Sequence, residues 1–255
     1  MTVKGTHAGC PGQFFEQAGL PSADACDEQP DRYGRYLFDP SHLKVMVETA
    51  VHGGTYYEGY TFTAQDTGTI AKTTSGAIVM DAGATDADDG PAIQRDEPII
   101  KVVAGKKYGM IARYKATNLT KAQYLIGLAE VLTAFHSTGV IVDEIVVGIG
   151  ADATSIAADS DGCYMMASNA AADVQQTNIG TLTTNSESWV GFVVDGAKVM
   201  KGWLDGVWSA NEEINQLPAA GSVLYPSVDI LSEGTSQPVL TLTHMEFRWE
   251  RDWTI

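Results

Sequence analysis

The carboxylates of this chain come closest to a pattern that could do chemistry, and the clearest pair lies near its C-terminal end. Glu246 and Glu250 are four residues apart, so both side chains lie on the same face if this segment is a strand. Glycoside hydrolysis uses two carboxylates that face each other across a cleft. Arg248 shares the face, however, and a ladder of ion pairs is the simpler interpretation. Asp143-Glu144 begins another apolar run but lacks a second Glu at a suitable interval.

A second group of carboxylates lies in the acidic segment of residues 81–97, which holds Asp81, Asp86, Asp88 and Asp89. A Ca²⁺ site needs several oxygen ligands that converge on the ion, and an acidic loop containing glycine can supply them. The spacing is not that of an EF-hand loop. The favoured interpretation is therefore a solvated turn, in which aspartate side chains accept hydrogen bonds from nearby backbone N–H groups.

The cysteines and the usual catalytic motifs give no better candidate. Cys10, Cys26 and Cys163 contain no Cys-x-x-Cys pair, which argues against zinc. Cys10 and Cys26 could close a loop if oxidised, but no apolar leader is visible at the N-terminus, which favours free thiols. A nucleophile elbow and a phosphate-binding loop are both missing from the sequence. We therefore expect no enzyme, with no catalytic, cofactor-binding or metal-ligating residues and no cofactor.

The charge of the chain limits its partners. Its formal net charge is −16, whereas nucleic-acid binding requires clusters of Lys and Arg. No apolar stretch reaches the length of about 18 residues that a membrane-spanning helix needs. We thus expect neither a nucleic-acid nor a membrane partner. The acidity is typical of a soluble protein and is also compatible with docking on a basic protein surface.

The stretch of residues 189–208 indicates the fold class. Two Asp-Gly pairs, Asp195-Gly196 and Asp205-Gly206, interrupt runs of Val, Phe, Met and Trp. Asp-Gly favours the positive φ angles of a two-residue type I′ turn, which joins antiparallel strands. We predict consecutive strands at residues 189–194 and 197–204, followed by a second reversal.

Most of the remaining chain shows the same pattern of short strands and tight turns, with hardly one convincing long helix. Each half-polar sheet must bury its apolar face, which predicts a two-layer β-sandwich. Met110, Ala112 and Tyr114 share one predicted face, and Leu240, Leu242 and Met245 mark another. The further strand candidates are residues 43–49, 56–62, 68–74, 76–80, 98–103, 108–115, 123–130, 144–151, 162–168, 223–231 and 239–249.

Residues 1–39 differ from the rest, because they mix Gly, Pro, Asp and small residues without clear periodicity. Phe14-Phe15 is the exception, since a solvent-exposed tail has little reason to carry a Phe pair. We predict an irregular N-terminal arm over residues 1–39 and a sandwich over residues 40–255. The arm could pack on this domain, on a neighbouring copy or on another protein; a partly disordered tail with a local anchor is the alternative.

Four pieces of sequence, taken in order, carry a family resemblance. They are the strand and acidic turn from Gly76 to Asp89, the Ala-Arg-Tyr-Lys strand at residues 112–115, Gly-Leu-Ala at residues 127–129, and the Asp-Gly hairpin at residues 203–207. Together these pieces, over about residues 68–249, resemble the concanavalin-like jelly-roll domains of tailed-bacteriophage structural proteins. That group includes head decoration and cement proteins.

The resemblance implies an all-β, antiparallel two-sheet jelly-roll sandwich with an irregular N-terminal arm. It also implies a virion structural protein, a capsid decoration or cement protein that binds the phage head through its arm and sandwich surface. Its partners would be the major capsid protein and neighbouring copies of itself, for instance in a homotrimer. Its location would be the virion, assembled in the host cytoplasm.

The alternative function is carbohydrate binding, as in a module of a phage tail or head fibre that adsorbs to host glycans. Trp203 and Trp208 flank a tight turn, and Tyr56, Tyr57 and Tyr60 form a second aromatic cluster. Exposed rings of this kind stack on sugars, although a half-buried strand position is the commoner environment for them. Exposure of these rings in a groove would favour the carbohydrate hypothesis.

Overall fold

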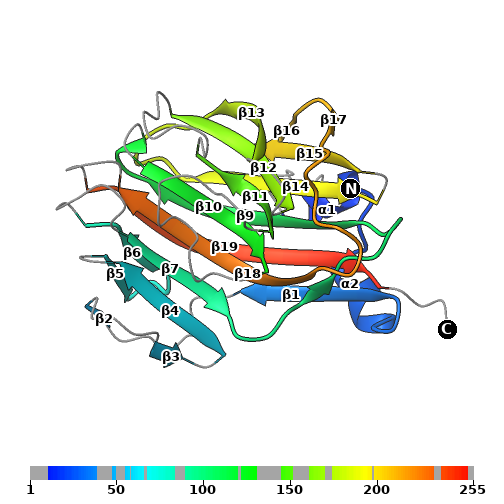
Figure 1. Ribbon diagram of the computed structural model, residues 1–255, viewed down its shortest axis with the longest axis horizontal. Coiled ribbons are helices and arrows are strands. Elements are labelled where there is room, and N and C mark those ends of the chain that lie inside the picture. Colours follow the sequence, from blue (N-terminus) through cyan, green and yellow to red (C-terminus); the bar gives the residue numbers. More distant parts are fainter. Residues whose placement is uncertain are drawn as a thin grey trace, which may run out of the picture.

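Two antiparallel β-sheets packed face to face make up most of the protein in the computed structural model (Figure 1). None of the helices it describes is both long and apolar enough to cross a membrane. The structure describes residues 11–38, 48–49, 55–57, 59–65, 68–83, 90–119, 122–130, 145–151, 161–169, 174–196, 198–232 and 237–251.

The first sheet, sheet A, has ten strands. They are β1 (Tyr33–Phe38), β2 (Glu48–Thr49), β5 (Thr69–Lys72), β6 (Ile78–Asp81), β9 (Tyr108–Ala116), β14 (Ser188–Asp195), β15 (Val199–Leu204), β16 (Val207–Trp208), β17 (Glu212–Glu213) and β19 (Val239–Glu250). Their order is β16-β15-β14-β9-β19-β6-β5-β2. The long strand β19 also pairs with β1, and β15 also pairs with β17.

The second sheet, sheet B, has nine strands. They are β3 (Thr55–Tyr57), β4 (Tyr60–Gln65), β7 (Gly90–Arg95), β8 (Ile100–Lys101), β10 (Ala122–Ala129), β11 (Ile145–Gly150), β12 (Gly162–Asn169), β13 (Gln175–Thr181) and β18 (Val223–Ser232). Their order is β13-β12-β11-β10-β18-β7-β4-β3, and β8 pairs with β18. The predicted antiparallel two-sheet sandwich is confirmed.

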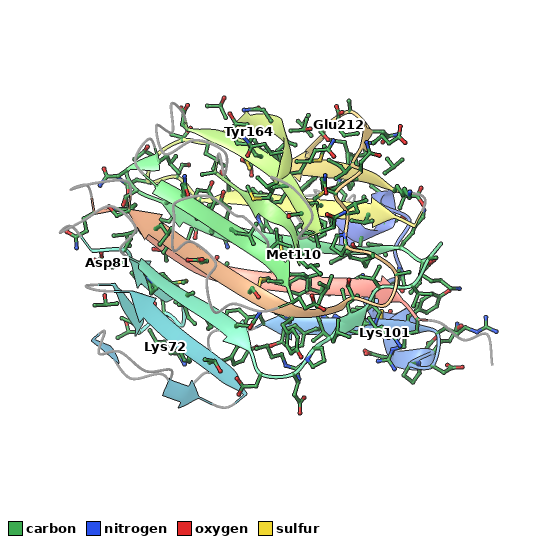
Figure 2. All side chains as sticks on the ribbon, viewed as in Figure 1. Lys72, Asp81, Lys101, Met110, Tyr164 and Glu212 are labelled. Atoms are coloured by element: carbon green, nitrogen blue, oxygen red, sulfur yellow. The ribbon has the colours of Figure 1, made fainter. Side chains whose placement is uncertain are left out.

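The main core lies between the two sheets. Met110, Ala112 and Tyr114 of β9 are buried in it as their alternation predicts, and Met110 is labelled near the middle of Figure 2. Tyr114 of sheet A and Tyr124 of sheet B share a hydrogen bond of 2.8 Å between their hydroxyl groups. Burial raises the pKa of both tyrosines well above the usual value. The two hydroxyls therefore stay protonated and satisfy each other inside the core.

Strand β19 contains a bulge that explains its irregular apolar spacing. Leu240, Leu242 and Met245 are all buried in the core, as predicted, although an odd spacing separates the last two. The pairing register with β9 shifts between Leu242 and His244. The extra residue of a bulge returns the following side chains to the same face of the sheet. After the bulge, His244 and Glu246 lie on the opposite, outer face.

The two Asp-Gly turns have different geometries. Asp205 and Gly206 have φ angles of 45° and 96°, and Leu204 pairs with Val207 across them. This is the predicted two-residue turn with positive φ at both positions. The prediction for Asp195-Gly196 was wrong: Asp195 pairs with Val199, so three residues form the loop. The left-handed position in this loop is Lys198, with a φ of 73°.

Several strands were missed, among them β1 in the segment predicted to be irregular, and β7 and β13, whose sequences do not look like strands. Strand β7 lies inside the segment predicted to be an acidic loop, and begins with Gly90-Pro91. It is held from both sides, by β4 and by β18, so tertiary pairing overrides its weak propensity. Strand β13 is polar and lies at the edge of sheet B, where only β12 pairs with it among the described strands.

The segment that the sequence sets apart, residues 1–39, contains helices α1 (Pro11–Gln17) and α2 (Ala23–Glu28) as well as β1 in its described part. Phe14 and Phe15 of α1 are 0% exposed. Three packing targets were considered for this Phe pair, and in the structure the pair packs on the chain's own domain. The cluster on the outer face of sheet A comprises Phe14, Phe15, Leu20, Ile111, Val193 and Trp203.

Candidate functional site

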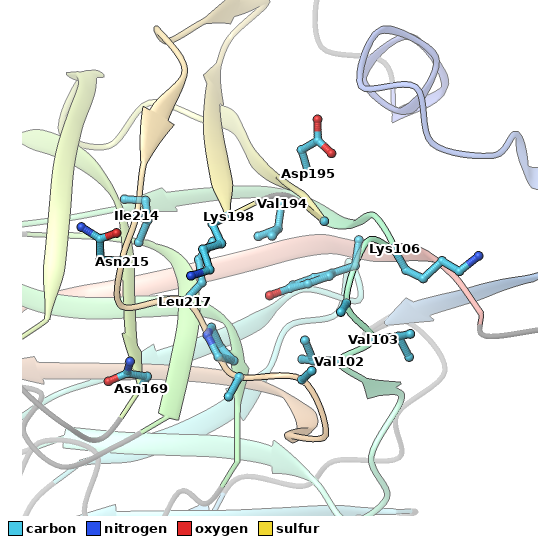
Figure 3. Close-up of a pocket in the computed structure, with 16 residues that line it drawn as sticks. Val102, Val103, Lys106, Asn169, Val194, Asp195, Lys198, Ile214, Asn215 and Leu217 are labelled. Atoms are coloured by element: carbon cyan, nitrogen blue, oxygen red, sulfur yellow. The ribbon is translucent and has the colours of Figure 1, made fainter.

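A cavity of about 330 Å³ lies where three loops of the sandwich meet (Figure 3). The loops are residues 102–106 before β9, residues 195–198 between β14 and β15, and residues 214–220 before β18. Asn169, at the end of β12, closes a fourth side. The volume of the cavity is within the range of small-molecule binding sites, about 300–1,000 Å³.

Backbone hydrogen bonds hold the three loops together. Gly105 N–H donates to the carbonyl oxygen of Gly196 at 3.0 Å, and Gly221 N–H donates to Val102 at 2.8 Å. Ile214 N–H donates to Lys198 at 3.2 Å. A Cβ at Gly196 would lie only 2.2 Å from the carbonyl carbon of Gly105, so the first contact requires glycine. The cavity is therefore formed before any ligand arrives.

Tyr108 is one of the lining residues, and its hydroxyl group is fully buried and has no hydrogen-bond partner in the structure. The residue is only 4% exposed, and burial raises the pKa of its hydroxyl well above the usual value. The group therefore stays protonated. A buried polar group without a partner costs about 1–3 kcal/mol.

Charged and amide side chains surround the aliphatic walls of the cavity. Lys198, Asn169 and Asn215 contribute polar groups to the lining. Figure 3 shows Lys198 running toward Leu217, while Lys106 and Asp195 extend away from the other labelled residues. Of the described lining residues, Asp195 is the only one with a carboxylate. Apolar walls with a few polar groups are typical of binding sites for small molecules.

The unpartnered hydroxyl leads to a prediction for Tyr108→Phe. The variant removes a buried polar atom without changing the ring, so its free energy of unfolding should rise by about 1 kcal/mol. Denaturant unfolding of both proteins measures the difference. A fall in stability would show that the hydroxyl has a partner in solution and would contradict its assignment as a free donor. Tyr114→Phe, which breaks the paired core hydroxyls, is the control and should destabilise the protein.

Glu246 and Glu250, the candidate catalytic pair, have structural partners. Glu246 Oε1 accepts hydrogen bonds from Arg35 at 2.7 Å and from Arg248 at 2.9 Å. Burial favours the neutral form, but the nearby His244, the hydrogen bond from Arg35 and the charge of Arg248 outweigh it and lower the pKa of Glu246 to about 2. Glu250 accepts a hydrogen bond from the Lys107 backbone N–H. The predicted ion-pair interpretation of Glu246 and Arg248 is confirmed.

The acidic segment is described only in part. Asp81 accepts a hydrogen bond from Gly83 N–H at 3.0 Å, which is the local bonding predicted for it, and a second one from the distant Gln237 amide at 2.7 Å. Asp86, Asp88 and Asp89 lie outside the described residues, as does Asp143-Glu144. Within the part of the chain that the structure describes, no three His, Cys, Asp or Glu side chains are grouped to hold a metal.

The cysteines that the structure describes have no partner cysteine. Cys26 and Cys163 are free thiols in buried positions. Burial raises the pKa of Cys163 to about 12, so this thiol is not a nucleophile near neutral pH. Cys10 lies outside the described residues.

The aromatic residues considered for sugar stacking are mostly covered. Trp203 is 1% exposed, and Trp208 is stacked on Phe14 with a ring separation of 5.2 Å. Tyr60 is 7% exposed and contacts Phe38 edge-on. The side chains of Tyr56 and Tyr57 lie outside the described residues. Trp203 is therefore covered, whereas Trp208 is partly exposed and lines a second, smaller cavity.

The sequence did not reveal the cavity, although it contained one signal. The Asp-Gly pair at residues 195–196 identified one of the three loops, and Tyr108 was placed at the start of a predicted strand. Nothing in the sequence shows that these residues meet residues 214–220, because about a hundred positions separate Tyr108 from that loop.

Comparison with known proteins shows the type of sandwich. No protein-family model and no curated protein matches the sequence. Among solved structures, basic winged bean lectin with Tn-antigen matches with a TM-score of 0.56 and 9% identity, covering 85% of this chain and 98% of the lectin. Peanut lectin matches with a TM-score of 0.54 and 10% identity, covering 85% and 97%. The fold is a concanavalin-like jelly-roll sandwich.

The concanavalin-like sandwich is also shared by a protein of unknown function from Shewanella oneidensis MR-1. That structure matches with a TM-score of 0.55 and 10% identity, and the match covers 100% of this chain and 99% of the other. At such low identity these likenesses establish the fold alone.

Proposed function

We propose that this protein is a carbohydrate-binding sandwich without catalytic activity and that the cavity beside Tyr108 holds the sugar. The preformed cavity, with aliphatic walls and a few polar side chains, carries the proposal. Aliphatic walls suit the C–H faces of a sugar, and the amides of Asn169 and Asn215 suit its hydroxyl groups. At the level of the fold, support comes from similarity to two lectins and to the Emp47p carbohydrate recognition domain, which matches with a TM-score of 0.50.

The absence of catalysis is part of this proposal. Glycoside hydrolysis by a pair of acids needs two carboxylates across the bound sugar. The described lining of the cavity offers only Asp195, whose side chain extends away from the other labelled residues in Figure 3. On the outer face of sheet A, Glu246 is 2% exposed and committed to two arginines. These arrangements support binding over hydrolysis.

Ala219→Trp tests the carbohydrate site. Ala219 is exposed and lines the cavity, so a Trp there fills the cavity without disturbing the core. We expect the full-length protein to bind members of a glycan array, and Ala219→Trp to lose at least about tenfold in affinity. Ala210→Trp, at another exposed alanine away from the cavity lining, is the control and should bind normally. Equal binding by both variants would place the site elsewhere, and an empty array would contradict the proposal.

The virion role predicted from the resemblance remains a prediction. In that role the chain decorates the phage head, bound to the major capsid protein and to copies of itself. Phe14 and Phe15 pack on the chain's own sheet, so the described arm does not offer them to a capsid. Quantitative mass spectrometry of purified virions tests this role, since a decoration protein requires hundreds of copies per particle.

A further inference from the structure

Lys198 is a cation directed toward the proposed sugar site, in a chain whose formal net charge is −16. Among the described residues no carboxylate forms an ion pair with it. Arg35, Arg95, Arg113 and Arg248, in contrast, each pair with a glutamate. The lysine at the cavity therefore keeps its charge available for a ligand.

The backbone conformation that positions the Lys198 side chain is energetically unfavourable. Its φ of 73° is in the left-handed region, which is unfavourable for a residue with a Cβ by about 1–2 kcal/mol. Three-residue hairpin loops use such a position, and glycine fills it without strain. Strain of this kind is found at ligand sites, where the surrounding structure holds the residue in place. Here the Lys198 carbonyl is held by Ile214 N–H.

The charged groups of the cavity lining favour a negatively charged ligand. Lys198 has an ammonium group with three donors and no acceptor. The carboxylate of Asp195, the strongest acceptor in the lining, is turned away from the other labelled residues (Figure 3). A carboxylate on the ligand, which only accepts hydrogen bonds, matches this set.

We propose that the cavity selects a carbohydrate that carries a carboxylate, a uronic acid or a similar acidic sugar, and that Lys198 binds this group. The inference rests on the proposed function, because it names the class of sugar for the same site. Lys198 lies in the loop between β14 and β15 and is exposed at the rim of the cavity. The acidic group would therefore be bound at this rim.

Matched pairs of sugars test the inference. D-glucuronate and D-glucose differ only at C6, as do D-galacturonate and D-galactose, so each pair isolates the carboxylate. We expect the full-length protein to bind at least one acidic member about tenfold more tightly than its neutral partner in NMR titrations. The preference should weaken as salt is added, because the lysine is exposed.

Variants show whether Lys198 causes the preference. Lys198→Met should abolish the difference between acidic and neutral sugar, and Lys198→Arg should keep it. Lys106→Met removes the same charge from a lysine that extends away from the other labelled residues, and should keep the preference (Figure 3). Thermal unfolding checks that each variant is folded.

The outcomes separate the two proposals. Equal binding of acidic and neutral sugars that Ala219→Trp abolishes would overturn the acidic-sugar inference and leave carbohydrate binding standing. A preference for acid that survives in Lys198→Met would overturn the role of Lys198. Failure of all four sugars together with an empty glycan array would overturn carbohydrate binding itself, and with it the inference.

Discussion

Phe14→Ala is expected to lower the free energy of unfolding by about 3–5 kcal/mol, the usual cost of truncating a buried phenylalanine. Phe14 is 0% exposed and contacts three aromatic rings: Phe15 at 5.0 Å, Trp203 at 5.4 Å and Trp208 at 5.2 Å between centroids. Aromatic pairs contribute beyond the area that they bury. Denaturant unfolding measures the loss, and tryptophan fluorescence should change because Trp203 gains access to water.

Leu37→Ala is the matched control for this prediction. Leu37 is an apolar residue of the same N-terminal segment but is 41% exposed, so its truncation should cost less than about 0.5 kcal/mol. If Phe14→Ala and Leu37→Ala were equally mild, α1 would not be docked on sheet A in solution. The arm would then be available to a partner, as the virion hypothesis requires.

Glu246→Gln is expected to cost about 3 kcal/mol, because it removes the anion from a buried cluster of charges. Glu246 and Arg248 are 2% and 4% exposed, and Arg35 completes the cluster from β1. Arg248 also donates to the Pro21 carbonyl oxygen at 2.8 Å and lies 4.1 Å from the ring centroid of Phe15. The glutamate thus neutralises an arginine that joins β19 to the N-terminal segment.

The Glu246 carboxylate should also make the stability of the protein depend on pH. Its pKa is about 2 in the folded protein and 4.5 as the ordinary value. Because the folded pKa is the lower one, its contribution is fully present above about pH 4.5 and is lost as the pH falls toward 2. Each pKa unit corresponds to about 1.4 kcal/mol, in agreement with the expected cost of the substitution. The difference between wild type and Glu246→Gln should therefore shrink over this window.

Glu187→Gln is the control for both measurements. Glu187 also pairs with an arginine, Arg113, but both side chains are more than 40% exposed. Exposed pairs contribute about 0–1 kcal/mol, so this variant should unfold almost as the wild type does at any pH. An equal loss in Glu187→Gln and Glu246→Gln would mean that burial does not set the strength of the Glu246 cluster.

Comparison of predicted and observed elements shows where local sequence is sufficient. Alternation placed Met110, Ala112 and Tyr114 in the core, and Asp205-Gly206 formed the expected turn. These features depend on residues that are neighbours along the chain. The ion pair between Glu246 and Arg248 was predicted for the same reason, since both lie on one strand. Arg35, its third member, comes from a distant strand and was missed.

Helix α1 shows why local sequence was insufficient elsewhere. It has seven residues, too few to be stable alone, and packing against Trp203 and Trp208 stabilises it. Strand β7 likewise exists because β4 and β18 pair with it on both sides. Asp195-Gly196 was expected to hold the positive φ angles, yet Lys198 holds one, because the pairing of Asp195 with Val199 makes this a three-residue loop.

By itself, the sequence determined the fold class, the strand faces and the acidic, motif-poor character of the chain. Each of these depends only on residue types and on the spacing of residues that are close in the sequence. The tertiary structure alone decided which rings are covered and which polar groups meet. Trp203 became core because α1 folds over it, and Lys198 became a candidate ligand-binding residue because its loop meets two distant loops around the cavity. Burial and long-range contact depend on how the elements pack, and packing is a property of the whole chain.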